Sequence, residues 1–318
     1  MVHADGVFSG GGVKGIAFAG AIRAAEQAGY TDWVRVAGTS AGAITAMALA
    51  VGYDSTQLKA LLEHTDFGKL ADTGGLPGEI VNLATHHGLT RGKALHEWLR
   101  GVLRDAPRKA MTFGELGDTS LQVVGTDIAH QRIVVFPADV ELYEDGNGNA
   151  LRPDEFPIAD AVRVSAGYPF FFPPLTLRDR ATGRDGVLVD GGVSSAFPVF
   201  LFDRPDPKHP TWGFRLYGGV SATTPPYEEI GGLDWPVEMA RAILDTAMNA
   251  FDAHNVIAFG DRTVSIPTGD VPTLDFSLSR GQQDFLYKSG YDTAKAFFDA
   301  HPDGRNNYGA TPAQLAGR

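Results

Sequence analysis

The sequence contains no cysteine among its 318 residues. Disulfide bonds, thiolate nucleophiles and cysteine-ligated metals are therefore excluded. Basic residues are also in deficit, because 27 Lys and Arg stand against 38 Asp and Glu, which leaves a formal net charge of −11. This deficit argues against a nucleic-acid partner, since phosphate binding depends on an excess of Lys and Arg. It argues equally against electrostatic binding of anionic lipid over a broad surface.

Long hydrophobic runs and targeting signals are missing as well. No stretch of about 18 apolar residues occurs, so no segment is expected to span a membrane. The N-terminus lacks a basic segment followed by an apolar run and a cleavage site, so no signal peptide is expected. With 43% hydrophobic residues and no low-complexity tract, the chain is expected to form a single domain over 1–318. Its core would cover about 5–290, followed by a C-terminal helix and tail, and its location would be cytoplasmic, with transient contact at a membrane surface allowed.

The pattern of apolar segments predicts an α/β fold. Strands at 6–8 and 33–37 alternate with helices at 13–29 and 43–50, which is typical of a mostly parallel sheet with crossover helices. Residues 54–107 are expected to be mostly helical, and one apolar helical face runs from Leu95 to Leu103. Further strands are predicted at 121–127, 132–136, 186–193, 211–216 and 263–266, and further helices at 158–165, 235–251 and 282–298.

A glycine-rich loop follows the first predicted strand. The sequence of residues 9–15 is SGGGVKG, which fits the G-x-G-x-x-G fingerprint of dinucleotide-binding proteins. That fold also needs an acidic residue at the end of the second strand, but Asp32 precedes the strand instead. A phosphate-binding P-loop needs a lysine after its last glycine, where this chain has Ile16. Nucleotide binding is therefore disfavoured, and no cofactor is expected.

The second predicted strand runs into Gly38-Thr39-Ser40-Ala41-Gly42, which matches the G-x-S-x-G motif of a nucleophile elbow. Gly38 and Gly42 would allow a sharp turn that exposes the Ser40 hydroxyl, although a cap of small residues on the next helix explains the same letters. Free amides of Gly11 and Gly12 in the first glycine loop could then form an oxyanion hole. Lys14 would either add positive charge there or be a solvated surface lysine.

The general base has several candidates. His209, His254 and His301 follow the serine in the chain, as the histidine of an α/β-hydrolase triad does, but none stands in a recognisable loop after a strand. The other candidate is Asp190, which ends a predicted strand and precedes Gly191 and Gly192. A plain hairpin turn explains that pattern by itself. Three glycine-flanked sites at strand ends nevertheless suit one shared pocket.

With these motifs the sequence resembles the patatin-like phospholipases, in particular bacterial members. The resemblance rests on GGGVKG (10–15), GTSAG (38–42) and DGG (190–192), in the family's order and spacing, and on the segments 89–99 and 161–174. Two departures are Ser9, where many members have an acidic residue, and Lys14, where arginine is frequent. The motif glycines are Gly10, Gly15, Gly38, Gly42, Gly191 and Gly192.

The resemblance implies a three-layer α/β/α fold with a Ser–Asp dyad and no metal. Ser40 would be the nucleophile, Asp190 the general base, and the Gly11 and Gly12 amides the oxyanion hole. A carboxyl group with a pKa near about 4 is a poor base at neutral pH, so the site is expected to be dry. The phenylalanines at 170–172 are expected near the pocket, mainly as core packing, and Ser165 is expected to be a structural hydroxyl.

The leading functional hypothesis is hydrolysis of acyl esters of phospholipids or lysophospholipids. A general carboxylesterase or an acyltransferase would use the same dyad, and a lipid-binding protein without turnover would keep the fold alone. A nucleotide-dependent oxidoreductase is the last alternative. The helical region 54–107 is expected to form part of a lid or membrane-facing surface, an expectation that rests on Leu76, Ile80, Leu83 and Leu89. The segment 145–149 is predicted to be a turn rather than a calcium loop, because Ala150 stands where such a loop needs glycine and Phe156 where it needs a bidentate glutamate. The oligomeric state is not predicted.

Overall fold

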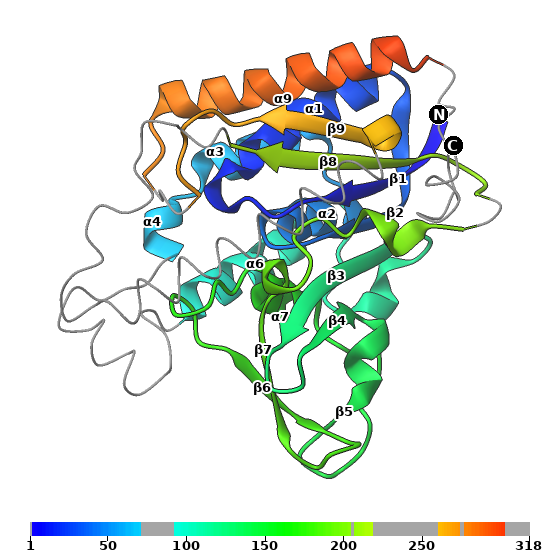
Figure 1. The fold of residues 1–318 in the computed structure, drawn as a ribbon, viewed down its shortest axis with the longest axis vertical. Coiled ribbons are helices and arrows are strands. Elements are labelled where there is room, and N and C mark those ends of the chain that lie inside the picture. Colours follow the sequence, from blue (N-terminus) through cyan, green and yellow to red (C-terminus); the bar gives the residue numbers. More distant parts are fainter. Residues whose placement is uncertain (1, 71–91, 205–206, 219–259, 274–276, 303–318) are drawn as a thin grey trace.

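A computed structural model describes residues 2–70, 92–204, 207–218, 260–273 and 277–302 (Figure 1). Within these residues, nine strands form one mixed sheet. Five neighbouring strands run parallel in the order β3-β2-β1-β8-β9. Their bounds are Val2–Phe8 for β1, Tyr30–Gly38 for β2, Ser120–Asp127 for β3, Thr211–Tyr217 for β8 and Thr263–Pro267 for β9. The predicted parallel core is therefore confirmed.

Antiparallel strands extend the sheet beyond β3. They are β4 (Arg132–Phe136), β5 (Tyr143–Glu144), β6 (Leu175–Asp179) and β7 (Asp185–Asp190). Strands β4 and β7 are predicted from the sequence, whereas β5 and β6 are not. Strand β5 has only two residues, and the polar side chains of β6 are exposed at alternate positions, so neither produces an apolar run.

The carboxyl ends of β2 and β7 meet head to head along one edge of β3. Val123 of β3 pairs with Gly38 of β2 and also with β4, whereas Gly125 pairs with Asp190 of β7 and also with β4. Because a strand residue has only two pairing edges, β4 must occupy one edge of β3 while β2 and β7 share the other. Strand β2 runs toward the junction from one side and β7 from the opposite side, so their last residues come together.

The main hydrophobic core lies between one face of the sheet and the long helices. Helix α1 packs closely against α9 and also against α3, while α2 lies over β1, β2 and β3 and α7 contacts β3 and α6 (Figure 1). All ten residues of α2 are buried, which its small side chains permit. The bounds are Ile16–Gln27 for α1, Ala41–Ala50 for α2, Ser55–His64 for α3, Phe67–Leu70 for α4, Lys93–Asp105 for α6, Ile158–Ser165 for α7 and Arg280–Ala300 for α9.

The opposite face of the sheet carries a smaller cluster. Phe8 and Val36 belong to the main core, and their strand neighbours Val7 and Ala37 belong to the second cluster, as alternation along a strand requires. The second cluster is completed by Phe197 and by the short helix η5 (Val199–Phe202). Other 3-10 turns are η1 (Gly12–Gly15), η2 (Phe113–Leu116), η3 (Ala138–Leu142), η4 (Gly191–Val193) and η6 (Gly260–Arg262).

These layers confirm the predicted α/β architecture with a mostly parallel sheet. The predicted apolar face of α6 is confirmed too, since Leu95, Leu99, Val102 and Leu103 are buried. The helix predicted at 235–251 lies outside the described residues. So do the lid candidates Leu76, Ile80, Leu83 and Leu89. In the part of the chain that is described, no helix combines the length and apolarity needed to cross a membrane.

Candidate active site

Ser40 stands on a sharp turn between β2 and α2. Its backbone has φ 55° and ψ −121°, a conformation that a residue with a side chain rarely adopts. The flanking glycines are required by space: a Cβ on Gly38 would lie 2.2 Å from the carbonyl oxygen of Gly42, and one on Gly42 would lie 2.2 Å from that of Phe8. This is the strained strand–turn–helix geometry of a nucleophile elbow. The reading of Gly38–Gly42 as a simple helix cap does not account for it.

The first glycine loop lies directly against Ser40. A Cβ on Gly10 would be 3.6 Å from the Ser40 Cβ, and one on Gly15 would be 3.4 Å from the Ala41 Cβ. The Gly10 amide donates a hydrogen bond to the carbonyl of Ala196 (2.8 Å). The amides of Gly11 and Gly12 make no hydrogen bond within the described residues, and both glycines line the cavity in front of Ser40. They are therefore placed to donate to a ligand.

The amide of Ala41 is a third donor, which is absent from the predictions made from the sequence. Ala41 is the first residue of α2 and lines the same cavity. Its N–H has no acceptor among the described residues, as is normal at the first position of a helix. The signal for it was present in the G-x-S-x-G motif, because the residue after the serine of an elbow commonly contributes an oxyanion donor.

Asp190 lies at the end of β7 with its backbone held on both sides. Its N–H donates to the carbonyl of Gly167 (3.1 Å), and its carbonyl accepts from the Thr126 hydroxyl (3.0 Å). The carboxylate accepts the Gly192 amide at 2.8 Å. Gly191 must be a glycine, since a Cβ there would lie 2.1 Å from the carbonyl oxygen of Val124. Asp190 therefore ends a strand at the β2–β7 junction and is not part of a hairpin turn.

The Asp190 carboxyl group is in a dry environment. Asp190 is 1% exposed. Burial raises the pKa of its carboxyl group to about 7, and the hydrogen bonds from the Gly192 amide and the Ser40 hydroxyl lower it by less. Desolvation penalises the charged carboxylate, and a single amide donor does not offset that penalty. The dryness expected from the sequence is thus present, and the pKa lies where a general base is effective at neutral pH.

The carboxyl end of α7 connects the two strand ends. The Ser165 hydroxyl, which is fully buried, accepts the Ser40 backbone amide at 2.9 Å. Two residues later, the Gly167 carbonyl accepts the Asp190 amide. This contact agrees with the expectation that the Ser165 hydroxyl has a structural role. The segment 161–174 therefore fixes the backbone of Ser40 relative to that of Asp190.

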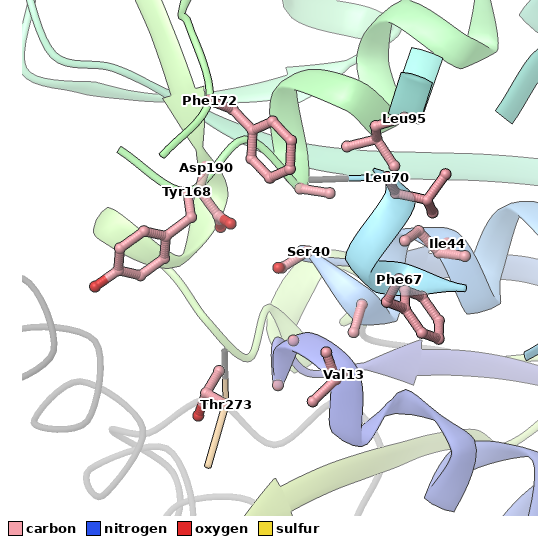
Figure 2. Close-up of a pocket in the computed structure, with 14 residues that line it drawn as sticks. Val13, Ser40, Ile44, Phe67, Leu70, Leu95, Tyr168, Phe172, Asp190 and Thr273 are labelled. Atoms are coloured by element: carbon pink, nitrogen blue, oxygen red, sulfur yellow. The ribbon is translucent and has the colours of Figure 1, made fainter. Parts of the chain in front are cut away.

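A cavity opens in front of these groups. In Figure 2, the Ser40 hydroxyl and the Asp190 carboxylate point into the same space, with apolar side chains around them. Phe172 lines this cavity, as the sequence analysis expected of a residue in its segment, while Phe171 packs against the core. The apolar lining residues are Val13, Ile44, Phe67, Leu70, Leu95, Ala166 and Phe172, joined by Tyr168 and Thr273.

Lys14 is not a surface lysine. It is 9% exposed, and burial lowers its pKa. Its ammonium group would lie 3.8 Å from a Cβ on Gly218, the residue directly after β8, and Lys14 is not among the described residues that line the cavity. The alternative of a solvated lysine is wrong. Electrostatic support of the Ser40 site by Lys14 stays a prediction.

The late histidines do not approach Ser40 where they are described. His209 contacts Asp5 (2.8 Å), which stands in the middle of β1 and not at the end that leads to the glycine loop. His301 follows α9 and stacks on Phe297. His254 lies outside the described residues.

The segment 145–149 is a turn, because Asp145 accepts hydrogen bonds from the amides of Asn147 and Asn149. Among the described residues, no cluster of three or more metal-binding side chains occurs.

The chain is similar to known proteins in sequence and in fold. The family model for patatin-like phospholipase matches residues 6–203. The protein YqhO of Bacillus subtilis (strain 168), which is described as uncharacterized, is 35% identical over 303 residues, covering 93% of this chain and 98% of its own. Among solved structures, VipD from Legionella pneumophila has a TM-score of 0.54 at 21% identity, over 94% of this chain and 67% of that one. The type III effector protein ExoU has a TM-score of 0.51 at 17% identity, over 95% of this chain and 53% of that one. At these identities the two structures show a common fold.

Proposed function

The chain belongs to the patatin-like phospholipase family, and we propose that it is a serine acyl hydrolase that cleaves acyl esters of phospholipids or lysophospholipids. The observation that carries this proposal is the junction of β2 and β7, where Ser40 and Asp190 face one dry, largely apolar cavity beside the amides of Gly11, Gly12 and Ala41. We also propose that the chain acts as a single domain without a metal ion, and that it contacts membranes only transiently.

In the proposed first step, the Ser40 hydroxyl attacks the carbonyl carbon of the ester and its proton passes to the Asp190 carboxylate. The carbonyl oxygen becomes an oxyanion, and the amides of Gly11, Gly12 and Ala41 donate hydrogen bonds to it. The intermediate collapses by breaking the bond to the alcohol, which leaves with the proton from Asp190. Ser40 is then acylated.

In the second step, Asp190 takes a proton from water, and the resulting hydroxide attacks the acyl-enzyme. The same amides hold the second oxyanion. Collapse breaks the bond to Ser40, the serine oxygen takes the proton from Asp190, and a fatty acid is released. An alcohol in place of water would give acyl transfer, and esters without a lipid headgroup would give carboxylesterase activity, so both alternatives are outcomes of the test below.

The apolar wall of the cavity supports an acyl chain as the bound group. Ile44, Phe67, Leu70 and Leu95 come from α2, α4 and α6 and lie together on one side of Ser40 (Figure 2). A methylene group transferred from water to such a wall gains about 0.8 kcal/mol. A long acyl chain therefore supplies much of the binding energy without a charged contact.

The test is hydrolysis of p-nitrophenyl esters and of lysophospholipid by the wild-type protein, Ser40→Ala and Asp190→Asn, with a chelator present throughout. We expect turnover by the wild type and a loss of several orders of magnitude in both variants, with folding checked by circular dichroism. Turnover of the soluble ester alone would point to a carboxylesterase. Lipid binding without any turnover would identify a non-catalytic lipid-binding protein, and activity retained in Asp190→Asn would contradict the proposed base.

A further inference from the structure

Helix α9, the last helix among the described residues, is connected to the proposed oxyanion loop, although the two lie far apart in the sequence. Helices α1 and α9 cross at two glycines. A Cβ on Gly20 would lie 2.0 Å from the carbonyl oxygen of Tyr287, and one on Gly290 would lie 1.9 Å from that of Ala17. The two backbones are therefore in direct contact, and α1 begins immediately after the glycine loop. The segment 260–300 that supplies α9 lies beyond the part matched by the family model.

From α9, two side chains hold the loop between β9 and α9. The Ser289 hydroxyl donates to the carbonyl of Pro267 at 2.6 Å. The Phe285 ring lies over Gly269, 3.2 Å from where a Cβ would be, and Gly269 has φ +54°. The loop is thus fixed where it leaves the sheet, and its later residue Thr273 reaches the cavity.

Thr273 makes the contact with the glycine loop. Its carbonyl oxygen accepts the Val13 amide at 3.1 Å. The same oxygen would lie 2.1 Å from a Cβ on Gly12, which has φ +56°. On the other side of the loop, the Gly10 amide donates to the carbonyl of Ala196. Gly11 and Gly12 therefore lie between two anchored residues, Gly10 and Val13. Their own amides have no acceptor among the described residues.

We infer that Thr273 is a positioning residue for the oxyanion hole and that α9 holds it in place through Ser289, Phe285 and the Gly20–Gly290 crossing. The inference rests on the proposed function for its effect on rate. The oxyanion exists only in the transition state and in intermediates, so a displaced loop lowers kcat more than it raises KM. A displacement of about 1 Å can cost on the order of a hundredfold in rate.

The experiment compares four variants in the full chain. Ser289→Ala removes the bond to Pro267, Ser289→Thr keeps a hydroxyl there, and Gly290→Ala forces α9 away from α1. Lys288→Ala, on the same helix, removes an exposed ion pair with Asp292 and is the control. Three quantities are measured: kcat and KM on a soluble p-nitrophenyl ester, the rate at which a p-nitrophenyl phosphonate labels Ser40, and amide hydrogen exchange of residues 9–15.

We expect Gly290→Ala to lower kcat and the labelling rate by about 10- to 100-fold, and Ser289→Ala by about 3- to 10-fold, with KM within about twofold. Exchange of residues 9–15 rises in both, while Ser289→Thr and Lys288→Ala stay close to the wild type. If Gly290→Ala does not fold, Ser289→Ala still decides the matter.

Unchanged kcat and unchanged exchange of residues 9–15 in Ser289→Ala would overturn the inference, even if its melting temperature falls. So would an equal loss in Lys288→Ala. A wild-type protein that neither turns over esters nor reacts at Ser40 would count against the proposed function. The exchange measurement would then still show whether α9 holds the glycine loop.

Discussion

The pairing of β3 with β7 buries one aspartate at each end, and the two have opposite properties. At one end Asp127 accepts hydrogen bonds from Tyr143, His130 and the Val187 amide. Burial raises its pKa, but these donors outweigh burial and the pKa is lowered. At the other end Asp190 has one amide donor and the nearby Ser40 hydroxyl, and burial raises its pKa to about 7.

The difference shows what separates a structural carboxylate from a reactive one in the same sheet. Both residues are almost fully buried, at 0% and 1% exposure. Asp127 is satisfied as an anion by a network that includes Arg132, so it ties the β3–β4 hairpin to the antiparallel strands. Asp190 is held through its backbone, and its carboxylate remains poorly solvated. A buried carboxylate with several hydrogen-bond donors stabilises the fold, whereas a buried carboxylate with few donors has a raised pKa and is a stronger base.

The same substitution at both ends is the strongest way to break this comparison. Asp190→Asn should lower kcat/KM by about 10²–10⁴-fold, because the amide cannot take the proton of Ser40. Asp127→Asn should stay within about threefold of the wild type in kcat/KM at a temperature where it is folded, because Asp127 does not touch the cavity. Ester hydrolysis under identical conditions measures both. Equal losses in the two variants would mean that the comparison is wrong.

The free energy of unfolding should show the reverse order of effects, with the larger loss in the Asp127 variant. Asp127→Asn should lower the free energy of unfolding by roughly 2–4 kcal/mol, since it leaves His130 and Arg132 facing a neutral amide. Asp190→Asn should cause no such loss. Urea unfolding followed by circular dichroism at neutral pH measures the two values. A larger loss in Asp190→Asn than in Asp127→Asn would show that Asp190 is the structural member of the pair.

The pH dependence sharpens the comparison further. The pKa of Asp190 is about 7 in the folded protein and about 4 in the unfolded chain. Between about pH 4 and pH 7 the folded protein therefore keeps a proton that the unfolded chain releases. Stability from this group is therefore full below about pH 4 and declines until the pH passes 7, with a slope of at most about 1.4 kcal/mol per pH unit. Over the same window kcat/KM should rise and level off above pH 7, because the base must be ionised.

Urea midpoints measured from pH 4.5 to 8 would test this slope. Asp190→Asn should lose the component of the slope that comes from this residue, whereas Ser40→Ala should keep it, because Asp190 is still present. A slope that is the same in all three proteins would show that Asp190 does not titrate in this range. A kcat/KM profile that is flat between pH 5 and 8 would argue against Asp190 as the base.

How much of this could be predicted from the sequence depends on the range of the interactions. The turn at Ser40 was predicted because its requirement for Gly38 and Gly42 is local. The side-by-side position of Ser40 and Asp190 was predicted only from the clustering of glycine motifs and from the family resemblance. Its cause, the head-to-head arrangement of β2 and β7, is a matter of register on β3 and leaves no local signal. The hydrogen bond from the Ser40 amide to the Ser165 hydroxyl joins residues 125 positions apart and could not be predicted from spacing. That the chain forms one domain stays a prediction.

The smallest effect concerns the backbone of Ser40, and the chain offers a matched pair of buried serines. Ser165→Ala removes the acceptor of the Ser40 amide, which costs about 1 kcal/mol and so should lower kcat about fivefold. The Ser195 hydroxyl is equally buried but has no hydrogen-bond partner within the described residues, so Ser195→Ala should stay within about twofold. Steady-state kinetics on a soluble ester measures both. If the two variants behave alike, the end of α7 does not orient Ser40, and the strand junction alone places Ser40 beside Asp190.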